Sequence, residues 1–132
     1  MIYDVSLSLP STVRVALFIT CLNDTLAPAA GIATARVLER VGCEVVFPEE
    51  QTCCGQMHAN SGYGEMALPL LRRFVRVFDD PHFDAIVSPS ASCVTMVHDQ
   101  DPRLATQAGD AQLGAQIEAL TPKVFELTGF RV

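Results

Sequence analysis

Short apolar segments alternate along this chain with longer segments whose apolar residues recur at helical spacing. Residues 14–20 form a nearly continuous apolar run, which is typical of a strand buried on both faces of a sheet. Further strands are expected at residues 43–47 and 85–88, with helices at 28–41 and 63–78 between the strands. The alternation predicts a three-layer α/β fold with Rossmann-like or flavodoxin-like topology, in which a parallel sheet of at least three strands has helices on both faces.

The remaining segments have weaker patterns, and the length of 132 residues fits a single domain. Residues 1–12 are expected to form a loose leader, and residues 99–114 a polar, flexible loop. A short helix beginning at Ser90 or Ser92 should hold Cys93. The buried faces are expected to comprise Ile32, Ala35, Leu38 and Val41 in the first helix, Met66, Leu70, Phe74 and Val77 in the second, and Ile117, Leu120, Val124 and Leu127 in a final helix.

Composition and charge restrict the partners and the compartment that the chain can have. Fifteen acidic and nine basic residues give a formal net charge of −6, and no long basic run is present. This balance argues against nucleic acid or an anionic membrane as a partner. The sequence contains neither a signal peptide nor an apolar stretch long enough to span a membrane, so a cytoplasmic location is expected. In a reducing cytoplasm, five cysteines indicate metal or redox chemistry rather than structural disulfides.

Four of the five cysteines follow the expected strands closely. Cys21 comes directly after the first strand, Cys53 and Cys54 follow the second, and Cys93 follows the third. Because the carboxyl ends of parallel strands meet at one edge of a sheet, the four thiols are expected to share one site. Gly55 follows the cysteine pair and can adopt the positive φ of a sharp turn, which would aim both sulfurs into one space.

Thiolates that come from separate loops are typical ligands of soft metals and iron–sulfur clusters. A [4Fe–4S] cluster is the favoured cofactor, since it takes four cysteines and is large enough to be reached from three loops. Zinc is the alternative, although structural zinc sites usually use paired Cys-x-x-Cys knuckles, which this chain lacks. A phosphatase-type thiol nucleophile is excluded because Ala27 stands where the phosphate-binding arginine is needed, and a Cys53–Cys54 disulfide switch would need a strained ring. Cys43 begins a strand at the opposite edge and is expected to pack in the core.

A lone cysteine, a distant Cys-Cys-Gly and a further cysteine form an ordered pattern at Cys21, residues 53–55 and Cys93. This pattern resembles the cysteine-rich CCG domain found in heterodisulfide reductases, glycolate oxidase iron–sulfur subunits and lactate utilisation protein A. The likeness is greatest to the first half of lactate utilisation protein A and covers about residues 14–130. It rests on four blocks that occur in the same order, at residues 15–21, 47–56, 60–63 and 88–94.

The resemblance implies an electron-transfer role in the oxidation of lactate, glycolate or a related α-hydroxy acid, with other iron–sulfur subunits as partners. It also implies that the four cysteines named above hold the cofactor. Met96 stands where the family's last cysteine is expected, and a methionine thioether is a weak ligand for iron. His58 lies four residues after Cys54, but a loop histidine without a ligand role is the simpler interpretation.

The chain carries one CCG half, whereas the proteins that it resembles carry two. We therefore expect no complete active site within it. The three alternatives are a fragment, a stand-alone half-protein, and a protomer that forms a homodimer through the apolar surface that would face the missing half. The alternative interpretation is a zinc-bearing or metal-free half-domain that acts as an interaction module for a redox partner.

Overall fold

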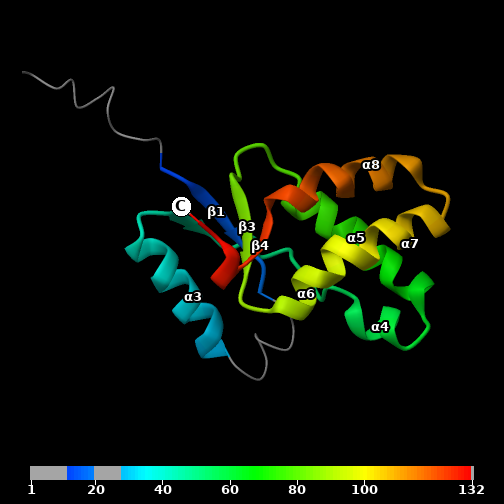
Figure 1. Cartoon of the computed structure of the whole chain (residues 1–132), viewed down its shortest axis with the longest axis horizontal. Coiled ribbons are helices and arrows are strands. Elements are labelled where there is room, and N and C mark those ends of the chain that lie inside the picture. The colour runs from blue at the N-terminus through cyan, green and yellow to red at the C-terminus, as the bar shows by residue number, and fades with distance from the viewer. Residues whose placement is uncertain (1–11, 20–27, 132) are drawn as a thin grey trace, which may run out of the picture.

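A computed structural model describes residues 12–19 and 28–131, and its centre is a four-stranded parallel sheet (Figure 1). The strand order is β2-β1-β3-β4, which corresponds to the first four strands of the flavodoxin-like order. The predicted α/β fold, with helices on both faces of a parallel sheet, is therefore confirmed. Apart from Thr12, the expected leader lies outside the described residues. The strands are β1 (Arg14–Leu17), β2 (Glu44–Val46), β3 (Ala85–Ser88) and β4 (Val124–Glu126).

Successive residues at β1 face opposite sides of the sheet. Val15 and Leu17 belong to a core cluster that also contains Leu38 of α3 (Pro28–Arg40), whereas Ala16 and Phe18 belong to a larger cluster on the other face. These four side chains are all buried. Burial on both faces explains why the sequence of the first strand is a continuous apolar run rather than an alternation of apolar and polar residues.

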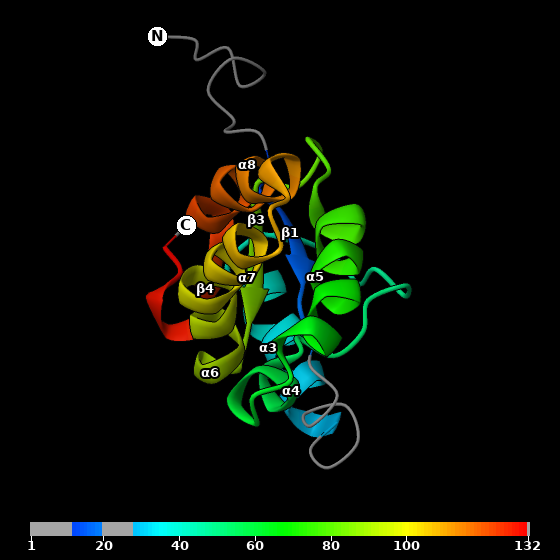
Figure 2. The ribbon, with the colours of Figure 1, turned by 90° about the vertical axis from the view of Figure 1, so that its right-hand side faces the viewer.

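The helices form the two outer layers of the fold (Figures 1 and 2). α3 covers one face of the sheet, while α5, α6, α7 and α8 gather over the other. On this second face, the rings of Phe18, Phe74 and Phe78 have centroids 4.8, 5.0 and 5.5 Å apart, in the edge-on and tilted geometries that aromatic rings prefer. The helices after α3 are α4 (Gln56–Asn60), α5 (Gly64–Phe78), α6 (Ala91–Thr95), a π-helical turn (Met96–Gln100), α7 (Asp101–Gln107) and α8 (Ala111–Leu120), with 3₁₀ turns at Thr121–Lys123 and Leu127–Gly129.

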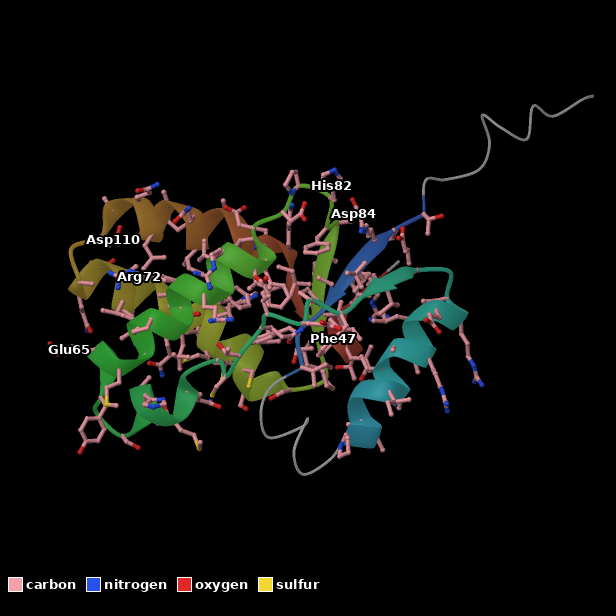
Figure 3. The ribbon with its side chains drawn as sticks, turned by 180° about the vertical axis from the view of Figure 1, so that it is seen from behind. Phe47, Glu65, Arg72, His82, Asp84 and Asp110 are labelled. Atoms are coloured by element: carbon pink, nitrogen blue, oxygen red, sulfur yellow. The ribbon has the colours of Figure 1, made fainter. Side chains whose placement is uncertain are left out.

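Polar contacts join the elements at the surface (Figure 3). Arg72 Nη2 of α5 lies 3.5 Å from Asp110 Oδ2 at the start of α8. At the amino edge of the sheet, Asp84 Oδ2 accepts a hydrogen bond from the backbone N–H of Arg14 at 2.8 Å. An exposed ion pair contributes at most about 1 kcal/mol, so the apolar helix faces supply most of the stability of this layer.

Residues 99–114 were expected to form a polar loop, but this prediction is wrong. The segment is mostly helical and contains α7 and the first turn of α8. Gly109 has a φ of 71° between the two helices, and Asp110 caps α8 by accepting a hydrogen bond from the N–H of Leu113 at 3.0 Å. Leu104 and Leu113 are buried. Each short helix has so few apolar residues that its periodicity is hidden by its polar neighbours.

The final helix ends at Leu120, earlier than predicted, and Val124 belongs to β4 instead. The 3₁₀ turn that contains Pro122 separates the two elements, as expected from the inability of proline to continue a helix. Val124 pairs with Ile86 of β3 and is buried, while Leu127 lies in the following turn. A strand of three residues is too short to produce a recognisable alternation of apolar and polar positions.

The buried faces of α3 and α5 differ in part from those expected, since Leu38 and Phe74 are buried as predicted but other residues are not. Ile32 and Val41 are exposed on or just after α3, and Met66 is 57% exposed on α5. Small residues lie at the closest approaches instead. At Gly31 of α3, for example, an added Cβ would lie only 3.4 Å from Ile19 Cδ1. The larger apolar side chains beside such contacts then face outward. The residues that α5 buries are Ala67, Leu71, Phe74, Val75 and Phe78.

Candidate metal centre

The structure brings the thiols of Cys54 and Cys93 together at the carboxyl edge of the sheet. The two Sγ atoms lie 3.2 Å apart, although the residues are 39 positions apart in the chain. This distance is that of a contact between thiols, since a disulfide bond is about 2.05 Å long. Cys54 comes from the loop after β2 and Cys93 from the first turn of α6, directly after β3. Two loops of a parallel sheet thus bring two sulfur atoms to one place.

Two serines hold Cys93 in position. The Ser90 side chain caps α6 by accepting a hydrogen bond from the backbone N–H of Cys93 at 3.4 Å. Ser88 Oγ in turn accepts a hydrogen bond from the N–H of Ser90 at 3.1 Å. Cys93 itself is 5% exposed and belongs to the larger core cluster. Its sulfur therefore occupies a fixed position that is mostly shielded from water.

Gly55 gives the cysteine loop its sharp turn. Its φ is 82°, in the left-handed region, and its N–H lies 3.4 Å from Cys53 Sγ. A Cβ added to Gly55 would lie 3.2 Å from Ala67 Cβ of α5, which is closer than an ordinary contact. Both the backbone conformation and the approach to α5 therefore favour glycine at this position.

Replacing Gly55 by alanine is expected to destabilise the fold by about 2 kcal/mol, because the new methyl group adds a steric contact to a positive φ. The matched control is Gly62→Ala, where φ is 85° but a Cβ would meet nothing within 4 Å. Urea denaturation of both variants measures the difference in the free energy of unfolding. Equal losses in the two variants would show that the contact with Ala67 does not matter.

The hydrogen bond with Cys93 and, after it, burial raise the pKa of the Cys54 thiol well above its usual range. Cys54 therefore keeps its proton at neutral pH in the metal-free protein. Because thiolates rather than thiols ligate metals, a metal ion must displace this proton when it binds.

The other residues that the sequence points to lie in different settings. Cys21 is outside the described residues. Met96 begins the π-helical turn and is buried in the larger core cluster, as a packing residue would be. His58 lies on α4, where its Nδ1 atom is buried and has no hydrogen-bond partner. Cys43 is buried in the cluster on the α3 side of the sheet.

Gln51 is a residue that the sequence analysis does not single out. Its side-chain amide makes three hydrogen bonds, two of which reach the end of β1 and the residues just beyond it. The sequence signal is only that Gln51 stands two residues before the cysteine pair. Glutamine is common in loops and its bonding partners are far away in the chain, so this role is not recognisable without the structure.

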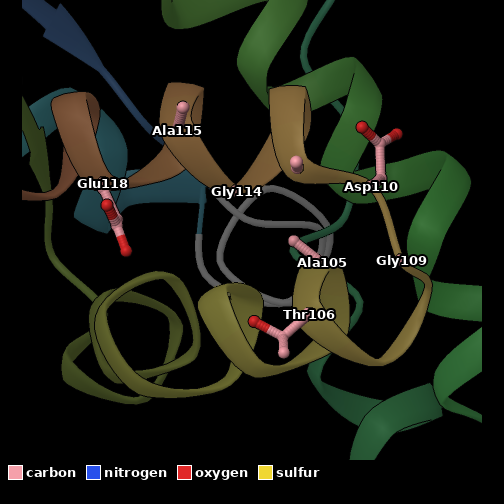
Figure 4. Close-up of a pocket in the computed structure, with 8 residues that line it drawn as sticks. Ala105, Thr106, Gly109, Asp110, Gly114, Ala115 and Glu118 are labelled. Atoms are coloured by element: carbon pink, nitrogen blue, oxygen red, sulfur yellow. The ribbon is translucent and has the colours of Figure 1, made fainter.

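Several cavities that the described residues form elsewhere in the fold do not contain these cysteines. One cavity of about 410 Å³ lies between α7 and α8 and is lined by small side chains such as Ala105 and Ala115 (Figure 4). A second, of about 450 Å³, lies along α3 beside Ile32 and Arg36. Neither is lined by a cysteine.

Among residues 12–19 and 28–131, no group of three or more His, Cys, Asp and Glu side chains is arranged to hold a metal ion. To hold a metal, the Cys54–Cys93 pair would need further ligands, and the chemistry of its two thiol donors fits a soft metal or an iron–sulfur cluster. None of the helices in the described parts of the chain has the length and apolar character needed to cross a bilayer.

The fold and the paired thiols define a cysteine-rich α/β domain, and a family comparison agrees with this class. Residues 15–98 match the family described as CCG, cysteine-rich domain, and the chain belongs to this family. The resemblance stated from the cysteine pattern is thereby confirmed.

Curated relatives give the same assignment. Lactate utilization protein A of an Exiguobacterium species is 48% identical over 119 residues, which cover 90% of this chain and 47% of the relative. Proteins of the same name from a Geobacillus species and from Bacillus cytotoxicus are 45% and 42% identical, and each match covers 90% of this chain and 48% of the relative. The chain thus spans about half the length of the curated relatives that it matches. No solved structure matches it.

Proposed function

We propose that the chain binds an iron–sulfur cluster of the [4Fe–4S] type through Cys21, Cys53, Cys54 and Cys93. The observation that carries this proposal is the 3.2 Å contact between the Sγ atoms of Cys54 and Cys93. The two thiols are buried or half-buried, come from distant parts of the chain, and lie at the edge where open α/β folds bind ligands. Binding of a shared metal would explain why their sulfurs are in contact there.

The arrangement of the described residues suits such a group. Cys93 is held by a capped helix start, and Cys54 by a glycine turn that is packed against α5. Partial burial of both sulfurs limits the access of water, which tunes the potential of an iron–sulfur cluster. When bound, the cluster would supply one-electron transfer, while the protein supplies the thiolates and the surrounding apolar core.

The cellular role that we propose is electron transfer in a cytoplasmic system that oxidises lactate, glycolate or a related α-hydroxy acid. The support is the name of the relatives, Lactate utilization protein A, together with their similarity over 90% of this chain. Other iron–sulfur subunits of such a system are the proposed partners. A second copy of the chain is a further candidate partner, because Ile32 and Val41 are more than half exposed on the α3 side.

A second candidate function is a zinc-bearing or metal-free interaction module for a redox partner. It is favoured by the finding that the described residues contain no group of three ligand-type side chains arranged around a metal. Met96, which takes the place of the family's last cysteine, is buried as an ordinary core residue.

Analysis of iron, zinc and acid-labile sulfide after anaerobic purification, with an ultraviolet–visible spectrum, distinguishes these functions. About four irons and four sulfides per chain are expected for a cubane on four cysteines. About one zinc without sulfide would support the zinc-bearing module instead. Protein that holds neither metal and cannot be reconstituted with iron and sulfide would contradict the metal-binding proposal and favour a metal-free module.

A further inference from the structure

We propose that Cys54 and Cys93 form a reversible disulfide when the site holds no metal, and that this bond prevents the loading of a metal until it is reduced. The effect on loading rests on the proposed function, whereas the formation of the disulfide does not. The two Sγ atoms are 3.2 Å apart and a disulfide bond is about 2.05 Å long, so the sulfurs need to approach each other by only about 1 Å.

The surroundings of the other described cysteines make Cys93 the favoured partner of Cys54. Cys53 is adjacent in the chain, and a disulfide between adjacent residues needs a strained ring. The sulfur of Cys53 lies within its own turn, 3.4 Å from the N–H of Gly55. Cys43 is buried in the cluster on the α3 side of the sheet. Only the sulfur of Cys93 is therefore already in contact with that of Cys54 among these cysteines.

The approach requires movement on one side of the pair alone. Cys93 is held by the capped first turn of α6 and is 5% exposed. Cys54 is half-buried and lies in the segment between β2 and α4, which has no regular secondary structure. Small adjustments of this side chain and its loop can bring its sulfur to Cys93, while α6 and the core around it stay in place. Cys54 is also the sulfur that a reagent in solution can reach more easily.

The oxidant that we propose is a low-molecular-weight disulfide such as oxidised glutathione. The sulfur of Cys54 attacks one sulfur of the oxidant, so that a mixed disulfide forms and one glutathione leaves. The sulfur of Cys93 then attacks Cys54 Sγ, the mixed disulfide bond breaks, and the second glutathione leaves. Each cysteine gives up one electron, the oxidant takes up both, and the two thiol protons end on the two glutathione molecules. A dithiol such as dithiothreitol reverses the reaction by the same exchange.

The disulfide removes two sulfurs from the set that can bind a metal. Soft metals and iron–sulfur clusters are held by thiolates, and neither sulfur of a disulfide is a thiolate. Reduction of the Cys54–Cys93 bond would therefore have to precede loading. Reversible disulfides that respond to the redox state of their surroundings are known among intracellular proteins, so this pair would make loading depend on that state.

Peptide mapping of the oxidised protein tests the disulfide. The metal-free, reduced chain is incubated anaerobically with oxidised glutathione until the map no longer changes, because the protonated Cys54 thiol reacts slowly. Remaining thiols are then alkylated, and the joined peptides are identified by mass spectrometry without reduction. We expect Cys54 joined to Cys93 and Cys43 alkylated. In urea, where the fold no longer holds the sulfurs together, the yield of this pair is expected to fall about tenfold.

Two variants serve as controls. Cys43→Ala and Cys53→Ser are both expected to keep the Cys54–Cys93 bond, because neither residue takes part in it. The proposal is overturned if wild-type Cys54 or Cys93 stays a thiol, stops at the mixed disulfide with glutathione, or is joined to a different cysteine. It is also overturned if Cys53→Ser loses the bond or if urea leaves its yield unchanged. The map of the wild-type chain decides the question even if a variant does not fold.

Titration with cadmium ion tests the effect on loading. Cadmium is a soft metal that thiolates bind, and unlike sulfide it does not reduce disulfides. The reduced protein is expected to bind cadmium at least about tenfold more tightly than the oxidised protein, and dithiothreitol should restore binding. Equal binding by both forms would overturn the effect on loading. If neither form binds cadmium, the proposed function fails and this effect fails with it, whereas the peptide map still decides the disulfide.

Discussion

Replacing Cys93 or Cys54 by serine is expected to abolish the retention of metal, whereas replacing Cys43 by alanine leaves the metal content unchanged. Cys54 and Cys93 have sulfurs 3.2 Å apart at the carboxyl edge, while Cys43 packs in the cluster under α3. A serine hydroxyl stays protonated at neutral pH and is a poor ligand for soft metals, so each single replacement would remove one of the proposed ligands. Iron, sulfide and zinc content per chain after anaerobic purification is the measurement.

The Cys43→Ala variant controls for the general effect of losing a buried thiol, since Cys43 is as well buried as Cys93. If both serine variants hold as much metal as wild type, the ligands lie elsewhere. Loss of metal in all three variants would instead indicate that metal retention only follows stability. Circular dichroism of each variant separates these outcomes, because a loss of ligands alone leaves the secondary structure intact.

The stability gained by replacing Asp101 with asparagine is expected to rise between pH 4 and pH 7, by up to about 4 kcal/mol in the free energy of unfolding. Asp101 is 2% exposed at the start of α7, and its Oδ1 atom has no hydrogen-bond partner. Burial raises the pKa of its carboxyl group to about 7. A neutral amide of the same shape avoids the cost of burying the charge.

The direction of this pH dependence follows from the pKa values of Asp101 in the folded and unfolded states. The unfolded carboxyl group titrates near pH 3.9, roughly three pH units below the folded one. Between these values the folded state binds more protons, so wild-type stability falls as the pH rises and the loss is complete above about pH 7. Urea denaturation at pH 4.5 and pH 8 measures this loss, and Asp99→Asn, at an exposed position in the preceding turn, is the control. A gain for Asp101→Asn that is the same at both pH values would refute the prediction.

The parallel sheet was predictable because its central strands are buried on both faces. The runs at β1 and β3 contain little besides apolar residues, and each is followed by a cysteine or serine at the end where ligands bind. Parallel topology then brings the loops after β2 and β3 to one edge without any further information. Chain order therefore predicts that Cys54 and Cys93 lie at the same edge of the sheet, but it does not predict that their sulfurs lie 3.2 Å apart.

Other features depend on contacts that no local pattern encodes. β4 is three residues long, and its place beside β3 is fixed by pairing with Ile86 rather than by its own propensity. The exposed side of α5 carries Met66 because Ala67 makes the close contact with Gly55. Two of the three hydrogen bonds of Gln51 join residues more than thirty positions apart, so no local sequence pattern gives a sign of them.

The strand order also determines when the two halves of the cysteine edge come together during folding. β2 joins β1 after one helical crossover, whereas β3 must reach β1 across the 70 positions that separate Arg14 from Asp84. Because the entropy cost of closing a loop grows with its length, the unit β1–α3–β2 is expected to form first. The bonds from Gln51 to β1 belong to that early unit, but Cys93 arrives only with β3. The pairing of Cys54 with Cys93 therefore reports the docking of β3 beside β1, and a cofactor that needs both sulfurs can be inserted only after that late step.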